Sequence, residues 1–258
     1  MPKFKMVSAG ILLLQCLPSF AAIFGPDDRV TLRSNEGSPF SALGIVTVAG
    51  GHTYATGFLV SPCHVLTVKH AVGDVASARG KSLYFTGGPK KIDRKWKSRG
   101  VVVATGDFDK NQAPRTLGQG RGKDWLLMRL DKCIGEELGY VELARSTGLD
   151  SGIQVESAGF PVDRPRQAPT IDPHCRIRAT LAAEWFHDCA TRPGNSGSPL
   201  FSISTAQGKP RLKVYAMHTA GAPDVSTQGF SLNNSGIAVP MDTILSMIEK
   251  PLHAATGS

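Results

Sequence analysis

The chain of 258 residues has few of the features that mark membrane, fibrous or zinc-binding proteins. It has no apolar run of 18 or more residues and no long helical heptads, so we expect neither a membrane span nor a coiled coil. No two cysteines have the close C-x-x-C spacing of a zinc site. What it does have is 41% apolar residues, 28 glycines and 17 prolines, a composition typical of compact, turn-rich globular chains.

The N-terminal segment 1–21 has the layout of a cleavable secretory signal peptide. It begins with the basic residues Lys3 and Lys5, continues through the apolar stretch MVSAGILLLQCLP, and ends in small residues. A small residue two positions before Ala21 predicts cleavage directly after Ala21, which leaves residues 22–258 as the mature chain. The alternative is a buried N-terminal helix. We therefore expect a secreted or periplasmic protein.

The formal net charge of +8 raises the question of an acidic partner. The densest group of basic side chains lies in the segment PKKIDRKWKSRG, and we call residues 90–99 the basic cluster. Its one aromatic residue, Trp96, is too little to stack nucleic-acid bases. We favour a solvated loop. A milder functional interpretation is that its positive field attracts acidic substrates. The alternative is a surface that binds nucleic acid or an anionic envelope, and such binding would weaken steeply with salt.

Four cysteines remain after the expected cleavage, namely Cys63, Cys133, Cys175 and Cys189. An even number in an exported chain suggests two disulfides, for which three pairings exist. We favour Cys175–Cys189, because this pair closes a short loop just before the segment GNSGSPL. Such a bond is worth about 3 kcal/mol and would hold that segment in place. Cys63–Cys133 is then the remaining pair.

The rest of the chain reads as short strands separated by turns. About ten apolar or β-branched runs bounded by Gly, Pro or Ser predict an all-β sandwich or barrel. The polar segment 139–152 could join two β-units, one ending near residue 138 and the other beginning near residue 150. Apolar side chains recur at helical spacing after Pro240, which predicts one terminal helix at residues 241–249.

The segment PGNSGSPLF, residues 193–201, contains a candidate nucleophile, Ser196. A serine hydroxyl needs a base to remove its proton and backbone N–H groups to stabilise the oxyanion that its attack creates. Gly194 would let the chain turn so that its own N–H and that of Ser196 form an oxyanion hole. Gly197 would leave room for the substrate. The alternative is an ordinary Gly/Ser turn.

Two further residues complete a possible catalytic triad. His70 lies at the end of the apolar run VLTV, and Asp124 directly precedes the apolar run WLLMRL. A buried carboxylate at Asp124 could fix the tautomer of His70 and stabilise its imidazolium form. His64 and Asp131 lie at the opposite ends of these runs and are weaker candidates. The order His, Asp, Ser differs from that of subtilisin-like and α/β-hydrolase enzymes.

Three blocks around these residues resemble trypsin-like serine peptidases of the chymotrypsin class. LTVKHA resembles their LTAAHC block, DWLLMRL resembles DIALLRL, and GNSGSPL resembles GDSGGPL. The resemblance implies two antiparallel six-stranded β-barrels, at about 40–138 and 150–240, with the active site in the cleft between them. It places His70 and Asp124 on the first barrel and Ser196 on the second.

Departures from that pattern resemble the bacterial glutamyl-endopeptidase branch. Asn195 replaces the acid that precedes the nucleophile, and the expected mature start AIFGPDDRV is not of the IVGG type. The usual activation of the family, in which a new N-terminal ammonium pairs with that acid, therefore cannot operate. Ser198 replaces the second Gly, as in the GNSGSP of that branch, which IFGPDDR and AGFP also resemble.

The same resemblance implies a substrate pocket. In that branch a Thr before the nucleophile and a His on a late strand bind the carboxylate of the P1 residue. Thr191 and His218 stand at the matching positions. Thr219, Ala220 and Gly221 would form the edge strand against which the substrate lies. The alternative is that His218 is a structural residue in an enzyme with a different preference.

These observations together predict a secreted serine endopeptidase that hydrolyses peptide bonds through an acyl-enzyme, with a possible preference for acidic P1 residues. We expect a monomer that acts on protein or peptide substrates, with no nucleic-acid partner, metal or organic cofactor. The alternative is a catalytically silent binding protein on the same fold with a basic surface.

Overall fold

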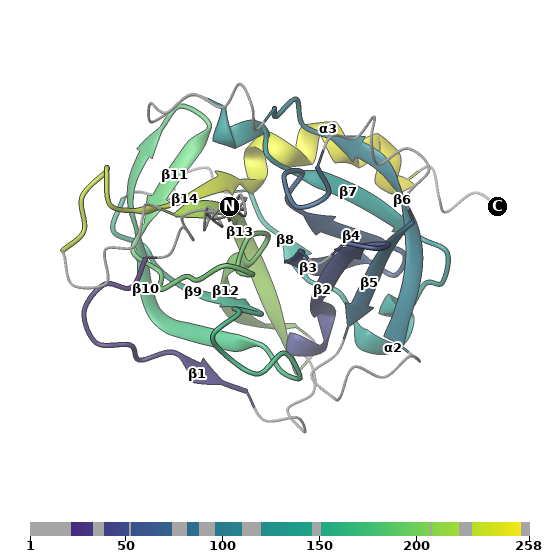
Figure 1. Ribbon diagram of the computed structural model, residues 1–258, viewed down its shortest axis with the longest axis horizontal. Helices are drawn as coiled ribbons and strands as arrows, with labels where there is room; N and C mark the ends of the chain where they lie inside the picture. The colour runs from purple at the N-terminus through teal and green to yellow at the C-terminus, as the bar shows by residue number, and fades with distance from the viewer. Residues whose placement is uncertain are drawn as a thin grey trace, which may run out of the picture.

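Figure 1 shows the computed structural model of the chain, in which two β-barrels stand side by side. The structure describes residues 22–32, 39–51, 53–73, 82–87, 96–109, 120–145, 151–206, 208–221 and 229–253. The expected signal peptide lies outside these residues, as do the members of the basic cluster that precede Trp96.

The first barrel is a closed antiparallel sheet. Its strands, in order around the barrel, are β2 (Leu43–Val48), β3 (Tyr54–Ser61), β4 (His64–Thr67), β7 (Leu126–Leu130), β6 (Lys97–Thr105) and β5 (Leu83–Gly87). The ring closes because β5 pairs with β2. Along its whole length β4 is buried, whereas the first five residues of β6 alternate between exposed and buried, as one-sided burial of a strand requires.

The second barrel is also closed and antiparallel. Its strands are β9 (Gln154–Gly159), β10 (Thr170–Leu181), β11 (Glu184–His187), β14 (Gly236–Pro240), β13 (Lys209–Gly221) and β12 (Pro199–Ala206). Both β10 and β12 pair with β9, which closes the ring. Two short strands join it: β1 (Val30–Thr31) pairs with β10, and β8 (Glu142–Leu143) runs parallel to β13. The predicted pair of six-stranded barrels is therefore confirmed.

Two strands of the second barrel gave no clear apolar run in the sequence. In β10, the buried Cys175 and Ile177 alternate with the exposed Arg176 and Arg178, so charged residues interrupt the apolar pattern. Strand β11 has only four residues, too few for a visible alternation. Both strands are recognisable only through their pairing with each other and with β9 and β14.

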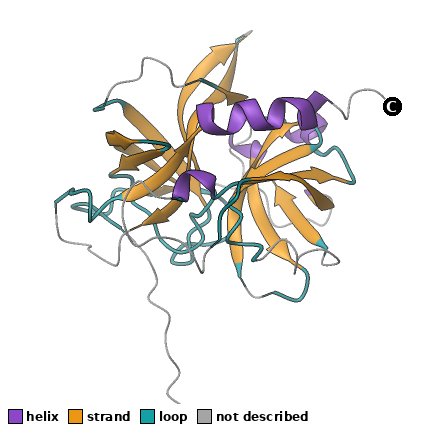
Figure 2. Cartoon of the chain, turned by 90° about the horizontal axis from the view of Figure 1, so that it is seen from above, coloured by secondary structure: helices purple, strands orange, loops and turns teal. Residues whose placement is uncertain are grey.

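Short helices complete the fold. The terminal helix α3 (Met241–His253) begins where the sequence predicted and extends beyond residue 249. It packs against β13 and β14 of one barrel and β6 of the other, and Figure 2 shows it lying across the two sheets. The other helices among the described residues are η1 (Phe40–Ala42), α2 (Gly135–Leu138) and η3 (Arg121–Lys123). Among the described residues, no helix is long and apolar enough to cross a membrane.

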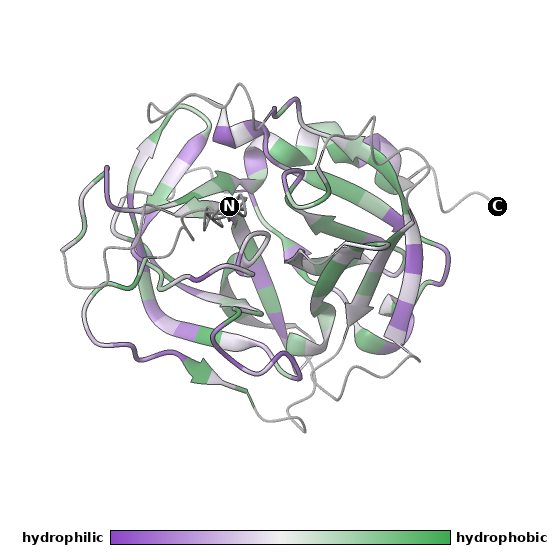
Figure 3. Cartoon of the chain, in the orientation of Figure 1, coloured by the Kyte–Doolittle hydropathy of each residue, from purple (hydrophilic) through white to green (hydrophobic). Residues whose placement is uncertain are grey.

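One hydrophobic core connects the two barrels with the helix. It includes Leu127 of β7, Phe201 of β12 and Ile244 of α3, all fully buried. Figure 3 shows the hydrophobic residues concentrated on the strands and on part of α3. Each such side chain stabilises the fold by about 1.5–3 kcal/mol on burial. The shared core therefore fixes the two barrels relative to each other.

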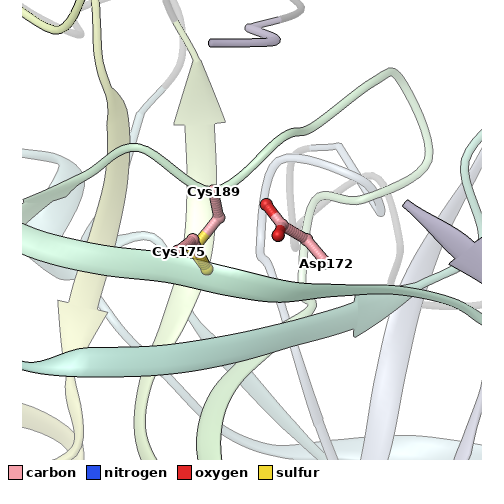
Figure 4. Close-up of side chains that lie close together, drawn as sticks. All are labelled: Asp172, Cys175 and Cys189. Carbon is pink, nitrogen blue, oxygen red and sulfur yellow. A yellow bond between two sulfur atoms is a disulfide. The ribbon is translucent and has the colours of Figure 1, made fainter. Parts of the chain in front are cut away.

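Both disulfides have the favoured pairing, Cys63–Cys133 and Cys175–Cys189. Figure 4 shows Asp172 beside the second of them. The two sulfurs and the Asp172 carboxylate form the one metal-like group found among the described residues, but sulfurs bonded to each other are not thiolate ligands. Two disulfides indicate an oxidising compartment.

Candidate active site

The loop that carries Ser196 turns through two glycines with positive φ. Gly194 has φ of 99° and Gly197 has φ of 88°, a region that disfavours residues with a side chain. A Cβ atom would also have no space, because it would meet the carbonyl oxygen of Phe160 at Gly194 and that of Thr56 at Gly197. These two positions therefore require glycine, and the turn that they allow brings the Ser196 hydroxyl to within 3.2 Å of His70 Nε2.

Hydrogen bonds tie this loop to both barrels. From β3 of the first barrel, the Thr56 N–H donates to the carbonyl oxygens of Gly194 and Ser196 at 3.1 and 2.9 Å. The Thr56 hydroxyl also donates to the Gly194 oxygen at 2.7 Å and accepts the Phe160 N–H at 3.0 Å. From β13 of the second barrel, the His218 carbonyl accepts the Gly197 N–H at 2.8 Å. The loop is thus fixed at the junction of the barrels.

Further hydrogen bonds order the residues that flank the loop. The buried Asp172 carboxylate accepts the N–H of Ala190 at 2.6 Å and that of His174 at 3.1 Å, beside the Cys175–Cys189 disulfide. Through these bonds the Asp172 carboxylate holds Ala190, which leads into the nucleophile loop. Burial raises the pKa of Asp172, and the two N–H donors oppose that shift.

The structure brings His70, Asp124 and Ser196 together. Asp124, fully buried, lies between η3 and β7, and its two oxygens accept the backbone N–H of His70 at 3.0 Å and its Nδ1–H at 2.6 Å. On the other side of the ring, Nε2 lies 3.2 Å from the Ser196 Oγ. Because an ionised carboxylate can only accept, Nδ1 carries the hydrogen and Nε2 presents its lone pair to the hydroxyl. This is the arrangement a general base needs.

The weaker candidates lie elsewhere. His64 is at the opposite end of β4, where its Nδ1 is 2.8 Å from the Ser61 hydroxyl. Asp131 forms an exposed ion pair of 2.7 Å with Arg99 of the basic cluster. Neither residue joins the group around Ser196.

The predicted oxyanion hole consists of the N–H groups of Gly194 and Ser196. Within the described part of the chain, neither the Gly194 N–H nor the Ser196 N–H donates to another protein group. The neighbouring Asn195 N–H, by contrast, donates to the Arg192 carbonyl at 2.9 Å. Two donors beside the Ser196 hydroxyl are thus available to a ligand.

The predicted pocket residues lie in two places. Thr191 pairs with Ala22 through two backbone hydrogen bonds of 2.7 and 3.1 Å, and its buried hydroxyl has no hydrogen-bond partner among the described residues. A Cβ on Gly221 would lie 3.6 Å from that hydroxyl.

Strand β12 pairs with β13 only as far as Met217, so one edge of β13 beyond that point has no partner strand in the described chain. The Thr219 hydroxyl donates to the Ile237 carbonyl at 3.2 Å, on the other edge.

Comparison with known proteins gives the family. A family model described as a trypsin-like peptidase domain matches residues 55–208, more than half of the chain. The chain belongs to the trypsin-like peptidase family. Peptides are therefore its substrate class. No curated protein sequence matches it.

Solved structures resemble this trypsin-like peptidase over most of its length. A Glu endopeptidase is 18% identical with a TM-score of 0.64, covering 91% of this chain and 100% of the other. Deg5 is 16% identical with a TM-score of 0.53, covering 81% and 87%. An HtrA-type protease, AlgW, is 18% identical with a TM-score of 0.54, covering 83% and 61%. Identities this low show the fold alone.

His187 and His218 form a buried pair of histidines, which the sequence did not reveal as a pair. The Cys189 N–H donates to His187 Nδ1 at 3.1 Å, so His187 carries its hydrogen on Nε2. That hydrogen points to His218 Nδ1 at 3.0 Å, which leaves His218 with its hydrogen on Nε2. Burial lowers the pKa of His187 to about 3 and that of His218 well below its usual value, to which nearby positive charges add. Both rings are therefore neutral.

A second group supports the segment before Asp124. The buried Glu184 of β11 accepts the N–H of Arg121 at 2.7 Å and that of Gly122 at 3.4 Å, so the second barrel fixes η3 of the first. The Arg121 guanidinium lies 3.6 Å from the Asp124 carboxylate and 4.9 Å over the Phe108 ring. Of these contacts, only the one between Arg121 and Asp124 has a local sequence signal, because the two residues are three positions apart.

Proposed function

We propose that this peptidase is a secreted serine endopeptidase that works through an acyl-enzyme. The observation that carries the proposal is the continuous set of contacts from the buried Asp124 carboxylate through His70 to the Ser196 hydroxyl, at 2.6 and 3.2 Å. Geometry of this kind is what recognises a triad on any fold. The oxidising compartment indicated by two disulfides supports export, for which the segment 1–21 is the proposed signal.

In the proposed mechanism, the Ser196 Oγ attacks the carbonyl carbon of the scissile peptide while His70 Nε2 takes its proton. Asp124 stabilises the resulting imidazolium. The N–H groups of Gly194 and Ser196 donate to the oxyanion of the tetrahedral intermediate, and one such donor contributes about 10²–10³ in kcat. The C–N bond then breaks as His70 gives its proton to the leaving amine.

Deacylation uses the same groups. A water molecule attacks the acyl ester while His70 Nε2 takes its proton, and a second oxyanion forms in the same hole. Collapse of this intermediate releases the carboxylic acid and returns the proton to Ser196. These residues supply every proton transfer, so the proposal invokes no metal or organic cofactor.

For the P1 residue we propose a preference for Glu. The Thr191 hydroxyl is buried with no hydrogen-bond partner in the described part of the chain, and the His218 Nε2–H is a donor fixed by His187. A side-chain carboxylate could accept both hydrogen bonds, and bonds to a charged acceptor are about twice as strong as neutral ones. The edge of β13 from Thr219 to Gly221 would pair with the substrate backbone.

Hydrolysis of matched peptides tests both levels of this proposal. The processed protein should cleave a peptide series that differs only at P1, with Glu preferred over Gln, Lys and Phe. Ser196→Ala and His70→Ala should remove cleavage of every member. Equal rates for Glu and Phe would remove the P1 preference alone. No cleavage of any peptide by the folded protein would favour the silent binding protein instead.

A further inference from the structure

An ion cluster built around the buried Arg29 lies between the N-terminal segment and the loop that follows β9, and its carboxylates are partly exposed. The Arg29 side chain is only 2% exposed. It donates to both carboxylate oxygens of Asp27 at 2.8 Å, and to both of Asp163 at 2.7 and 3.3 Å. Arg164 adds an ion pair of 2.9 Å with Asp27. Because Asp163 is 134 residues away in sequence, the guanidinium joins two separate parts of the chain.

These contacts favour the charged forms of Arg29 and Asp27. Although burial opposes it, hydrogen bonds to the two carboxylates raise the pKa of Arg29 above its usual value. The guanidinium in turn holds the pKa of Asp27 well below its usual range. A bidentate guanidinium–carboxylate pair also fixes the orientation of both planes. Arg29 therefore sets the position of the Asp163 carboxylate.

The loop that contains Asp163 packs against the nucleophile loop. The Val162 N–H donates to the Pro193 carbonyl at 2.8 Å. The Phe160 carbonyl oxygen occupies the space that a Cβ at Gly194 would need. A displacement of the Asp163 loop would therefore move the Gly194 peptide, whose N–H is one of the two proposed oxyanion donors.

Arg192 provides a second connection between Asp163 and the nucleophile loop. Its Nε lies 3.8 Å from the Asp163 carboxylate, and its backbone N–H donates to Asn195 Oδ1 at 3.0 Å. The Asn195 amide is thus engaged within its own loop, where its Nδ2 also donates to the Ser198 hydroxyl at 3.3 Å. Asn195 offers no negative charge, and Asp163 is a carboxylate that contacts both Arg192 of this loop and the buried Arg29.

The N-terminal segment is itself held on both sides of Arg29. Before it, Ala22 pairs with Thr191. After it, β1 pairs with β10. The guanidinium is therefore presented from a backbone with little freedom, as a positioning role requires.

We propose that Arg29 is a positioning residue that orders the nucleophile loop through Asp163, an inference that rests on the proposed serine peptidase function. The cation that anchors the loop is thus the Arg29 side chain, and not the N-terminal ammonium of the family's usual activation. The loop that carries Gly194 is ordered whenever Arg29 is seated between its two carboxylates.

Three variants of the processed protein test this inference: Arg29→Met, Arg29→Lys and Asp163→Asn. Arg29→Met should lower kcat about 100-fold, the loss expected when one oxyanion donor is misplaced, with KM changed less than about threefold. The affinity for a peptide aldehyde, whose hemiacetal oxyanion occupies the same hole, should fall by a factor similar to that of kcat. Arg29→Lys should restore part of both.

Arg145→Met is the matched control, because it removes an arginine from an exposed ion pair with Glu249 at 3.1 Å. It should leave kcat, KM and aldehyde affinity unchanged. If Arg29→Met does not fold, Asp163→Asn decides, since it should show the same loss in kcat. A folded variant with unchanged kcat, or with a change in KM alone, would overturn the inference while leaving the peptidase proposal intact. An inactive wild type would overturn both.

Discussion

Thr56→Val should show how strongly the first barrel holds the nucleophile loop of the second. The Thr56 side chain is fully buried, and its hydroxyl donates to the Gly194 carbonyl and accepts the Phe160 N–H. Valine has nearly the same shape but removes both hydrogen bonds and leaves the buried Phe160 N–H unsatisfied. A buried donor without a partner costs about 1–3 kcal/mol and the lost bond about 1 kcal/mol more. We expect a loss of about 2–4 kcal/mol in the free energy of unfolding.

Chemical unfolding followed by circular dichroism measures this loss, and thermal unfolding should show a fall in Tm of about 5–15 °C. Thr67→Val is the matched control, because Thr67 is equally buried but its hydroxyl makes a single donated bond, to the Thr56 carbonyl at 2.7 Å. It should cost about 1 kcal/mol. If Thr56→Val is no more destabilising than Thr67→Val, the proposed fastening of the loop through the hydroxyl is wrong.

Two further changes test the catalytic step and the P1 preference, and a third tests stability in acid. Asp124→Asn should lower kcat about 10⁴-fold with KM little changed, because an amide N–H facing Nδ1 forces His70 into the wrong tautomer; a loss below tenfold in steady-state kinetics would contradict this. His187→Phe removes the donor to His218 and should reduce the ratio of kcat/KM for Glu over Leu at P1 about tenfold, with the Leu value retained. Asp27, whose pKa the guanidinium beside it depresses, contributes stability above pH ~4 that is lost as pH falls, so in acid-unfolding curves Asp27→Asn should flatten the decline below that pH.

Local sequence was enough for those parts of the protein that depend on neighbouring residues. Several strands of the first barrel, such as β4, are apolar runs, and the loop between Cys175 and Cys189 is short, so both were predictable from the sequence. Ser196, with glycines on each side, also stood out, and the structure brings it to the two predicted partners. Their catalytic roles remain a prediction.

The supports of the site could not be predicted, because each joins segments far apart in the chain. Glu184 fixes η3 from a different barrel, and Arg29 meets Asp163 across 134 residues. No periodicity or motif records such a contact, since each depends on how the closed barrels place their loops. His187 was hidden for another reason: it lies on β11, a strand too short to detect.

Labelling with a serine-directed phosphonate tests the central claim most directly. The reagent forms a covalent bond only with an activated serine, and mass spectrometry of the digested protein locates it. The proposed function predicts stoichiometric modification at Ser196 of the processed protein and no modification of His70→Ala. Folded wild-type protein that remains unlabelled, or that is labelled equally in His70→Ala, would contradict the account.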